Sequence, residues 1–142
     1  MAEGKTTKAT GGCLCGAIRF ETSGEPLWVA HCHCSHCRRH TGAAVATFVG
    51  FLDEQVMFVE GLRKMFESSP GVQRGFCNTC GTPISYEGDR CEGEIHLHIS
   101  TMDDPDRFPA NVHVFHSEKI SWFETDDDLP RYKGTGEGEE GN

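Results

Sequence analysis

Cysteines occur in this chain at spacings that suit metal binding. Cys13 and Cys15 stand one residue apart in the run GGCLCG, and Cys77 and Cys80 enclose two residues in FCNTCG. Four thiolates from two such turns are typical of structural zinc, which they surround as a tetrahedron with Zn–S distances of about 2.3 Å. We expect this site to tie the N-terminal part of the chain to its middle. The spacing also permits a redox-active CxxC pair beside a separate CxC pair.

A glycine directly follows each of these pairs, Gly16 after Cys15 and Gly81 after Cys80. Glycine adopts a positive φ without steric strain, so the backbone can turn tightly around a metal. Such turns let backbone N–H groups approach the ligand sulfurs, as supporting hydrogen bonds do around metal sites. We therefore expect both glycines to have positive φ.

A second group, Cys32, Cys34 and Cys37, lies in the run CHCSHC. Three thiolates leave a tetrahedral zinc with one open position, as in catalytic sites. A thiolate-bound zinc is thiophilic, so the thiol of a substrate would suit that position. An iron–sulfur centre is one alternative. Another is a second structural zinc completed by a nearby histidine: His31, His33, His36 or His40.

Two arginines, Arg38 and Arg39, directly follow this group. They are candidates to bind a substrate carboxylate through charge-assisted hydrogen bonds, and their charge would offset an anionic zinc–thiolate centre. The alternative is a solvated pair on the surface, the usual position of arginine. His33 and His36 are candidates to carry protons or to donate hydrogen bonds to the metal ligands.

The other chemically capable side chains have weaker patterns. His96 and His98 share one face of an alternating run, so we expect ordinary strand positions for both. Cys91 has no cysteine near it in the sequence, and we expect it to behave as a small apolar side chain without a functional role. Packing is the role that we expect of three aromatic residues: Trp122, Phe123 and Tyr132.

Short segments rich in β-forming residues must position these groups. Ile95 and Leu97, for example, alternate with histidines, as in a strand with one apolar face. The expected strands are Ala17–Thr22, Leu27–His31, Val45–Phe51, Gln55–Val59, Arg63–Glu67, Gln73–Phe76, Glu94–Ser100 and Val112–Phe115. The expected helical turns are Ser35–Thr41 and Asp103–Phe108, the second with Pro105 near its start. The sequence thus predicts a mainly β fold with metal-bearing loops.

A length of 142 residues suits one domain. We expect a flexible N-terminal arm over residues 1–10, a zinc domain over 11–133 and a disordered acidic tail over 134–142. No run approaches the roughly 18 apolar residues of a membrane helix, and the start MAEGKTTKAT lacks the apolar stretch of a signal peptide. We therefore expect a cytoplasmic protein with no membrane partner.

The formal net charge is −9 with neutral histidines. Filling a four-cysteine site with Zn²⁺ replaces four thiol protons and lowers the charge by two, and a three-cysteine site lowers it by one, so two filled sites give −12. A strongly negative protein repels phosphate backbones. The charge thus argues against a nucleic-acid partner.

On the residues alone, three classes of function remain open. The first is a zinc enzyme acting on a thiol, the second a module that binds a protein or metabolite, and the third a non-catalytic zinc carrier or sensor. Replacing Cys34 by serine separates them, because only the enzyme should lose turnover while it keeps its fold.

Taken together, the runs GGCLCGAIRF, CHCSHCRRHTGAA and RGFCNTCGTPISY resemble the glutathione-dependent formaldehyde-activating enzyme (GFA) family, which includes centromere protein V. The later segments ISTMDDP, VHVFHSEKISWF and DLPRY resemble the same family, and His113 in the second of them is a candidate to face the site. The likeness extends over residues 10–133 and includes all seven clustered cysteines.

This resemblance implies a Mss4-like fold of packed antiparallel β-sheets. It implies a structural zinc and a catalytic zinc, two ions per chain. The implied ligands are Cys13, Cys15, Cys77 and Cys80 for the first ion and Cys32, Cys34 and Cys37 for the second. The implied activity is of carbon–sulfur lyase type and joins glutathione to formaldehyde as S-hydroxymethylglutathione. The implied partner is therefore a small-molecule thiol such as glutathione.

Overall fold

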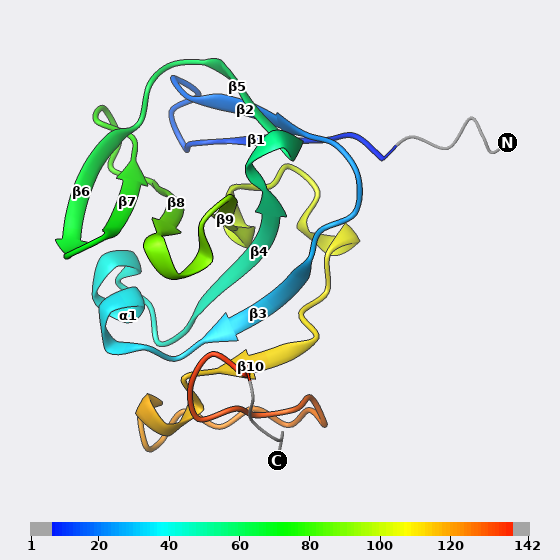
Figure 1. Ribbon diagram of the computed structural model, residues 1–142, viewed down its shortest axis with the longest axis vertical. Helices are drawn as coiled ribbons and strands as arrows, with labels where there is room; N and C mark the ends of the chain where they lie inside the picture. Colours follow the sequence, from blue (N-terminus) through cyan, green and yellow to red (C-terminus); the bar gives the residue numbers. More distant parts are fainter. Residues whose placement is uncertain (1–6, 138–142) are drawn as a thin grey trace, which may run out of the picture.

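The structure, a computed structural model, describes residues 7–137 and contains two β-sheets (Figure 1). The small sheet joins its strands in the order β1-β2-β5, and the large sheet in the order β10-β3-β4-β9-β8-β7-β6. All pairs of neighbouring strands are antiparallel except β10 and β3, which are parallel. The strands are β1 (Ala9–Gly12), β2 (Arg19–Thr22), β3 (Trp28–Cys32), β4 (Ala46–Leu52), β5 (Val56–Glu60), β6 (Lys64–Ser69), β7 (Val72–Phe76), β8 (Pro83–Gly88), β9 (Glu94–His98) and β10 (Val112–Val114).

One α-helix, α1 (Ser35–Thr41), lies within the described residues and follows β3 almost directly. It ends at Gly42, whose left-handed conformation lets its N–H bond to the Arg38 carbonyl at 2.7 Å. Short 3₁₀ turns connect other elements, at η1 (Asp53–Gln55), η2 (Asp89–Cys91), η3 (Ile99–Thr101), η4 (Pro105–Arg107) and η5 (His116–Glu118).

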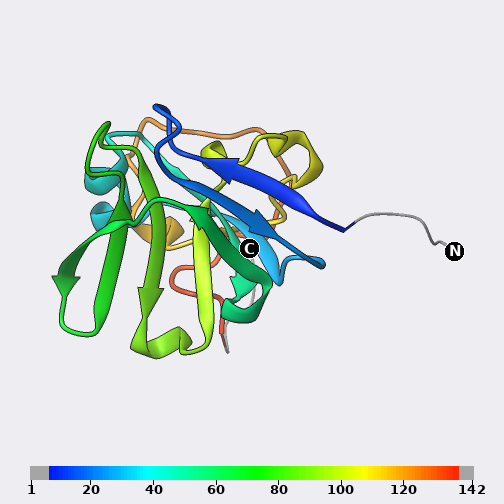
Figure 2. The same ribbon diagram turned by 90° about the horizontal axis from the view of Figure 1, so that it is seen from above.

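The main core lies between the two sheets, where the small sheet covers one face of the large one (Figure 2). Phe20 of β2 meets Phe51 of β4 and Leu97 of β9 there, and all three are fully buried. Burial of such large side chains is the main source of stability in a domain of this size. The core fixes the positions of the turns that join β1 to β2 and β7 to β8.

The opposite face of β4 supports a second, smaller cluster. Ala46 and Phe48 point to this face and pack with Cys32 and Cys37, while Val49 belongs to the main core. A strand buried on both faces has mainly apolar residues at successive positions, as residues 46–52 do apart from Thr47. The central strand therefore holds the cysteines of β3 and α1 against the large sheet.

Gly11 of β1 lies where no larger residue fits. A Cβ placed on it would stand 2.4 Å from both the Phe20 ring and the Thr101 carbonyl oxygen. Glycine thus allows β1 to pass closely over the core. Because glycine weakens the β pattern of Ala9–Gly12, the sequence does not predict this strand. Residues 9 and 10, expected in the flexible N-terminal arm, belong to β1 instead.

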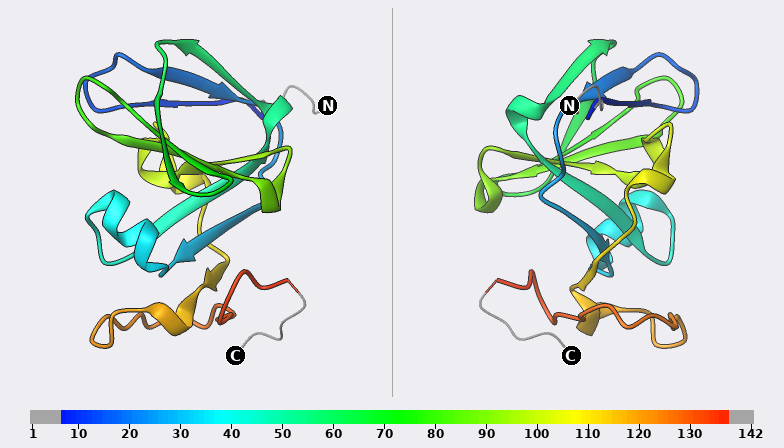
Figure 3. Two further views of the ribbon diagram at one scale, coloured as in Figure 1. Left: turned by 60° about the vertical axis from the view of Figure 1, so that its left-hand side comes forward. Right: turned by 90° about the vertical axis from the view of Figure 1, so that its right-hand side faces the viewer.

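After β10 the chain runs along the outer edge of the large sheet beside β10, as the orange and red segments show in Figure 1 and Figure 3. Backbone hydrogen bonds attach this segment. The His113 N–H donates to the Pro130 carbonyl at 2.8 Å, and the Tyr132 N–H donates to the His113 carbonyl at 2.9 Å. Phe115 also donates its N–H to Gly134, so residue 134 of the predicted tail is bonded to the domain.

The mainly β prediction is confirmed, with the parallel pair as an addition to the expected antiparallel sheets. Each expected strand is present within a few residues, and the helix Ser35–Thr41 has the predicted bounds. The expected turn at Asp103–Phe108 is the shorter η4, which begins with Pro105. Strand β8 was missed because Pro83 reads as a turn, although proline is tolerated as the first residue of a strand. Residues 1–6 and 138–142, parts of the predicted arm and tail, lie outside the described residues.

Candidate metal centres and their cavity

Four cysteines from two distant turns meet at one point. Cys13 and Cys15 lie between β1 and β2, and Cys77 and Cys80 between β7 and β8, with all four sulfurs within 4.8 Å of one another. The Cys13–Cys15 and Cys15–Cys77 Sγ distances are 3.7 and 3.8 Å. A tetrahedral ion with Zn–S bonds of about 2.3 Å requires sulfurs about 3.8 Å apart. The four-cysteine cluster therefore fits a metal ion of this size.

Backbone N–H groups surround these sulfurs. Cys13 Sγ accepts from the Ile18 N–H at 3.2 Å, and Cys77 Sγ accepts from the Thr79 and Cys80 N–H groups, both at 3.4 Å. Hydrogen bonds from the Thr82 hydroxyl and backbone lower the pKa of Cys80 to about 5. These donors favour thiolates, the form in which cysteine binds metal.

The glycines after each pair behave as expected, with φ of 85° at Gly16 and 82° at Gly81. Each N–H closes a turn, by donating to the carbonyl of Cys13 and Cys77 respectively. All eight cysteines lie within the described residues, and each is a free thiol. The geometry favours a closed metal site over the alternative of two independent cysteine pairs, because it brings both pairs together.

The other three clustered cysteines come from one loop. Cys32 ends β3, Cys34 directly precedes α1, and Cys37 lies within α1. Their sulfurs lie within 4.8 Å of one another, with 3.5 Å between Cys32 and Cys37. Hydrogen bonding to Cys32 lowers the pKa of Cys34, while the same contact raises the pKa of Cys32. Three crowded thiols cannot all ionise unless a cation joins them, so this three-cysteine cluster suits a metal ion.

Arg74 of β7 stands beside this cluster and was not found in the sequence. Its side chain is 3% exposed, and its Nη1 donates to Cys37 Sγ at 3.6 Å. The Ser68 hydroxyl accepts from Nε at 2.9 Å, and the guanidinium lies 5.0 Å from the centre of the Tyr86 ring. A buried arginine beside thiolates offsets their negative charge. No local pattern distinguishes it from other strand positions, because Cys37 lies 37 residues away in the chain.

Arg38 and Arg39 have a different environment from the one predicted. Arg38 Nη1 donates to the carbonyls of His33 and Glu118, both at 2.6 Å, so it links the loop of the cluster to η5. The Arg39 side chain is exposed on α1. Neither residue lines the cavity beside the three cysteines. His36 is also exposed and outside the cavity lining.

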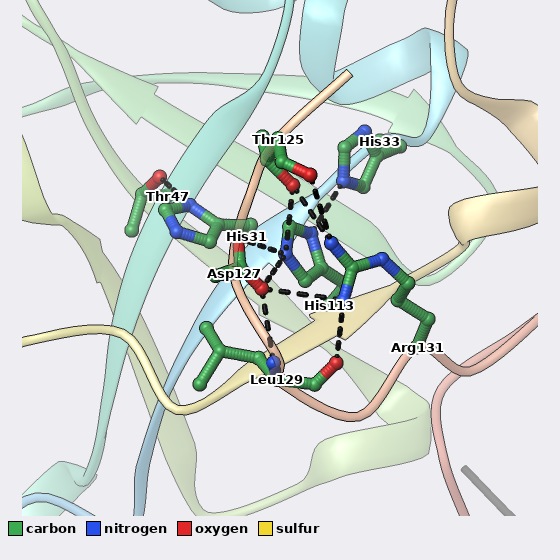
Figure 4. A network of polar contacts seen from close by, with 8 residues as sticks. All are labelled: His31, His33, Thr47, His113, Thr125, Asp127, Leu129 and Arg131. Carbon is green, nitrogen blue, oxygen red and sulfur yellow. Dashed lines mark hydrogen bonds and ion pairs between the residues drawn. The ribbon is translucent and has the colours of Figure 1, made fainter. Parts of the chain in front are cut away.

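A chain of polar groups, of which the two histidines are buried, lies behind the loop (Figure 4). His33 Nε2 is 2.9 Å from His113 Nδ1, and His113 Nε2 is 3.1 Å from an oxygen of Asp127. Arg131 contacts the same carboxylate at 3.2 Å. Because Asp127 accepts the Nε2 proton of His113, Nδ1 is left as an acceptor for the N–H of His33. The His113 candidate thus faces His33, next to Cys32 and Cys34, rather than the cavity.

The rings of His33 and His31 are held neutral. Burial lowers the pKa of His33 to about 4, and the neighbouring His113 adds to the effect. Burial also lowers the pKa of His31, whose Nδ1 lies 2.7 Å from the Thr47 hydroxyl. Neutral imidazoles at these positions orient the loop through hydrogen bonds.

The three-cysteine cluster opens on a cavity of about 450 Å³. This volume lies within the range of about 300–1,000 Å³ for small-molecule sites. Its aromatic lining comes from Trp28, Phe48, Tyr86, Phe115 and Tyr132. Its polar lining beyond the cluster comes from Arg74, Arg90, Cys91, Glu94, His96, Thr135 and Glu137.

Several expectations for individual residues need correction. Cys91 lines the cavity instead of packing as an isolated apolar side chain. His96 and His98 do share the face opposite Ile95 and Leu97, but that face is enclosed, and His98 is buried. Of the three aromatic residues that were expected to pack, Phe123 lies near the His33 ring. Trp122 is instead exposed, and Tyr132 lines the cavity.

Comparison with known proteins places the chain in a family. The profile of the glutathione-dependent formaldehyde-activating enzyme family matches residues 8–118, which include all seven clustered cysteines. The chain belongs to this family. The family resemblance seen in the sequence is thereby confirmed.

A crystal structure of a Rhodobacter sphaeroides protein has a similar fold, with a TM-score of 0.57 and 24% sequence identity. The alignment covers 66% of this GFA-family chain and 87% of the other. Comparison with curated proteins finds no match. Within residues 7–137, the helices are all too short or too polar to cross a membrane.

Proposed function

We propose that the protein is a zinc-dependent enzyme of carbon–sulfur lyase type, which joins glutathione or a related thiol to formaldehyde. One observation carries this proposal: a cluster of three cysteines opens on a cavity large enough for a small molecule, with two arginines and several aromatic side chains in its walls. The family's formaldehyde-activating name supports the same reaction class.

Zinc is the ion that we assign to both clusters. At the four-cysteine cluster the sulfur spacing near 3.8 Å and the N–H donors to sulfur suit Zn²⁺. Both clusters offer all-sulfur donor sets, which also suit this ion. Zinc on the three-cysteine cluster would lower the pKa of a substrate thiol that binds beside it. The free thiols of the chain suit a reducing compartment, and we place the protein in the cytoplasm.

The chain's own residues bind and orient the thiol. Arg74 and Arg90 are the arginines in the cavity lining, and we assign to them the carboxylates of a substrate such as glutathione. This assignment replaces the one made for Arg38 and Arg39, whose side chains lie outside the lining. The aromatic walls exclude water from the reacting atoms.

The reaction adds the thiol across the carbonyl group. A bond forms between the thiol sulfur and the carbonyl carbon, the π bond of C=O opens, and the thiol proton ends on the oxygen. Burial raises the pKa of Tyr86, so its hydroxyl keeps its proton and can donate a hydrogen bond to that oxygen. The reverse reaction breaks the carbon–sulfur bond.

Cys34→Ser tests the proposal, because it removes one ligand from the open cluster and none from the closed one. We expect the zinc content to fall from two ions to one, and the formation of S-hydroxymethylglutathione, followed by NMR, to fall to the uncatalysed rate. Ser35→Ala is the matched control, since Ser35 is the next residue and lies outside the cavity lining. Unchanged catalysis in Cys34→Ser, or a wild-type rate no higher than the uncatalysed one, rejects the enzyme assignment.

A further inference from the structure

Three side chains outside both clusters converge on the wall of the same cavity. Cys91 ends η2, and Glu94 and His96 lie two residues apart on one face of β9. One donor atom from each lies within 4.8 Å of the others, and all three residues are partly exposed and line the cavity. The loop 92–93 between the two elements brings the sulfur back over the strand.

The His96 ring is fixed in place. Its Nε2 lies 2.9 Å from a carboxylate oxygen of Glu94. The ring stands edge-on to Trp28, with centroids 4.5 Å apart, and stacks on Tyr86 at 5.5 Å and 15°. The side chain is 13% exposed, so it has little freedom to turn away. A ligand held in one orientation loses little entropy when it binds a metal.

From this geometry we infer a third metal site, in which Cys91 Sγ, a Glu94 oxygen and a His96 nitrogen bind a divalent transition metal such as Zn²⁺. The donor set of one thiolate, one carboxylate and one imidazole is typical of zinc. A tetrahedral ion with bonds of about 2.0 Å to nitrogen and oxygen separates these atoms by about 3.3 Å. The present 2.9 Å between His96 and Glu94 needs only a small expansion, as the ion replaces the proton that they share.

Charges of both signs surround the three side chains. Burial raises the pKa of the Cys91 thiol, and the nearby carboxylates of Glu94, Glu137 and Glu87 add to the effect. Glu87 is itself paired with Arg63 at 2.9 Å, and Arg74 and Arg90 also line the cavity. The attraction for a cation therefore comes from the three donor atoms themselves, and a bound ion would favour the thiolate form of Cys91.

This site differs chemically from the three-cysteine cluster. Three thiolates give a divalent ion a net charge of −1, whereas one thiolate, one carboxylate and a neutral imidazole give zero. The less neutralised ion is the stronger Lewis acid and prefers oxygen ligands. Three protein ligands also leave a position open to the cavity. The ligand class that fits is a carbonyl or carboxylate oxygen, which goes beyond the function proposed above.

The test is a titration with Co²⁺ of the reduced protein that has been loaded with only two zinc ions per chain, one for each cysteine cluster, read by metal analysis and by the thiolate-to-cobalt charge-transfer band. We expect one further ion per chain in the wild type. Cys91→Ser should lose the band, and His96→Gln should weaken binding of this ion by about 100-fold, because even supporting residues change metal affinity by roughly 10–100-fold.

Glu92→Gln is the matched control. Glu92 lies between the ligands in sequence, its side chain is exposed, and it is not one of the three proposed ligands. It should leave the cobalt affinity unchanged. The third site should also survive in Cys34→Ser, which separates this inference from the proposed function. No further ion in the wild type, or an unchanged band in Cys91→Ser, overturns the assignment.

Discussion

The two cysteine clusters use the same ligand atom in opposite ways. The four-cysteine cluster joins turns 62 residues apart and encloses its centre with four sulfurs. The three-cysteine cluster draws its sulfurs from the six-residue run 32–37 and leaves one side toward the cavity. The first therefore links the two sheets, while the second adds little to the connection of distant elements.

The closed cluster thus suits a role in stability and the open cluster a role in chemistry, although both use cysteine sulfur as the ligand. A closed site that joins distant segments contributes its metal-binding free energy to folding, since the unfolded chain does not preform it. An open site keeps a position for substrate and relies on the scaffold to hold its shape. Here that support comes from Arg74, Phe48 and the polar chain behind His33.

The largest effect is expected for Cys77→Ser, which breaks the closed site. Structural zinc contributes on the order of 10 kcal/mol in small zinc domains, and a whole domain is stable by only about 5–15 kcal/mol. We therefore expect the variant to unfold or to lose more than about 10 °C in Tm. Thermal denaturation with zinc analysis measures this.

Leu14→Ala is the control for that experiment. Leu14 lies between Cys13 and Cys15, and its side chain is 89% exposed. Its removal should change stability by no more than about 0.5 kcal/mol. If Cys34→Ser lowers Tm as much as Cys77→Ser does, the two clusters contribute equally to stability, which contradicts the distinction between them.

A smaller effect, confined to the open site, is expected for Arg74→Gln. The variant loses a buried positive charge beside Cys37 and the proposed partner of a substrate carboxylate. Hydrogen bonds to charged groups contribute about 1.5–3 kcal/mol, so KM for glutathione should rise by about tenfold or more. Steady-state kinetics at fixed formaldehyde measures the change.

Arg74→Lys refines this experiment. It keeps the charge but not the two-pronged geometry of the guanidinium, so KM should recover only in part. Zinc at the four-cysteine cluster should be unaffected in both variants. An unchanged KM in Arg74→Gln would contradict the assigned role.

The smallest effect is expected for Asp127→Asn, which weakens the polar chain behind the open cluster. Hydrogen bonds from Leu129 and His113 hold the pKa of Asp127 below its usual range, although desolvation opposes them. The folded state thus prefers the ionised carboxylate, and its contribution to stability is present above the unfolded pKa of about 4 and is lost as the pH falls below it. Wild type should exceed the variant in Tm by a few degrees at pH 7, with the difference disappearing in acid.

Asp126→Asn makes the same charge change at an exposed neighbouring position and should leave Tm nearly unchanged. A chelator competition gives a second readout. Asp127→Asn should release zinc faster from the three-cysteine cluster and not from the four-cysteine cluster. Equal release from both clusters would show that the polar chain has no specific role at the open site.

Sequence reasoning succeeded where the signal is local. The cysteine spacings identified both clusters, and the run Ser35–Thr41 gave the helix with its bounds. The alternation of Ile95 and Leu97 with histidines predicts a strand with two different faces, and β9 has this arrangement. In each case the residues that determine the structure lie within a few positions of one another.

The missed features depend on contacts between distant segments. Arg74 meets Cys37 although β4, β9 and β8 lie between β3 and β7 in the large sheet. Asp127 reaches His113 because the C-terminal segment runs back beside β10. Strand β1 depends on Gly11, whose lack of a side chain weakens the β pattern while it permits close packing. A single sequence carries no local signal for such pairings.

The spacing of the cysteines also has a consequence for synthesis on the ribosome. The chain emerges from its N-terminus, so the three-cysteine cluster has all its sulfurs once residue 37 has left the exit tunnel. The four-cysteine cluster cannot close until residue 80 has followed. All the sulfurs of the open centre are therefore outside the ribosome before the nascent chain contains the element that will join its two sheets.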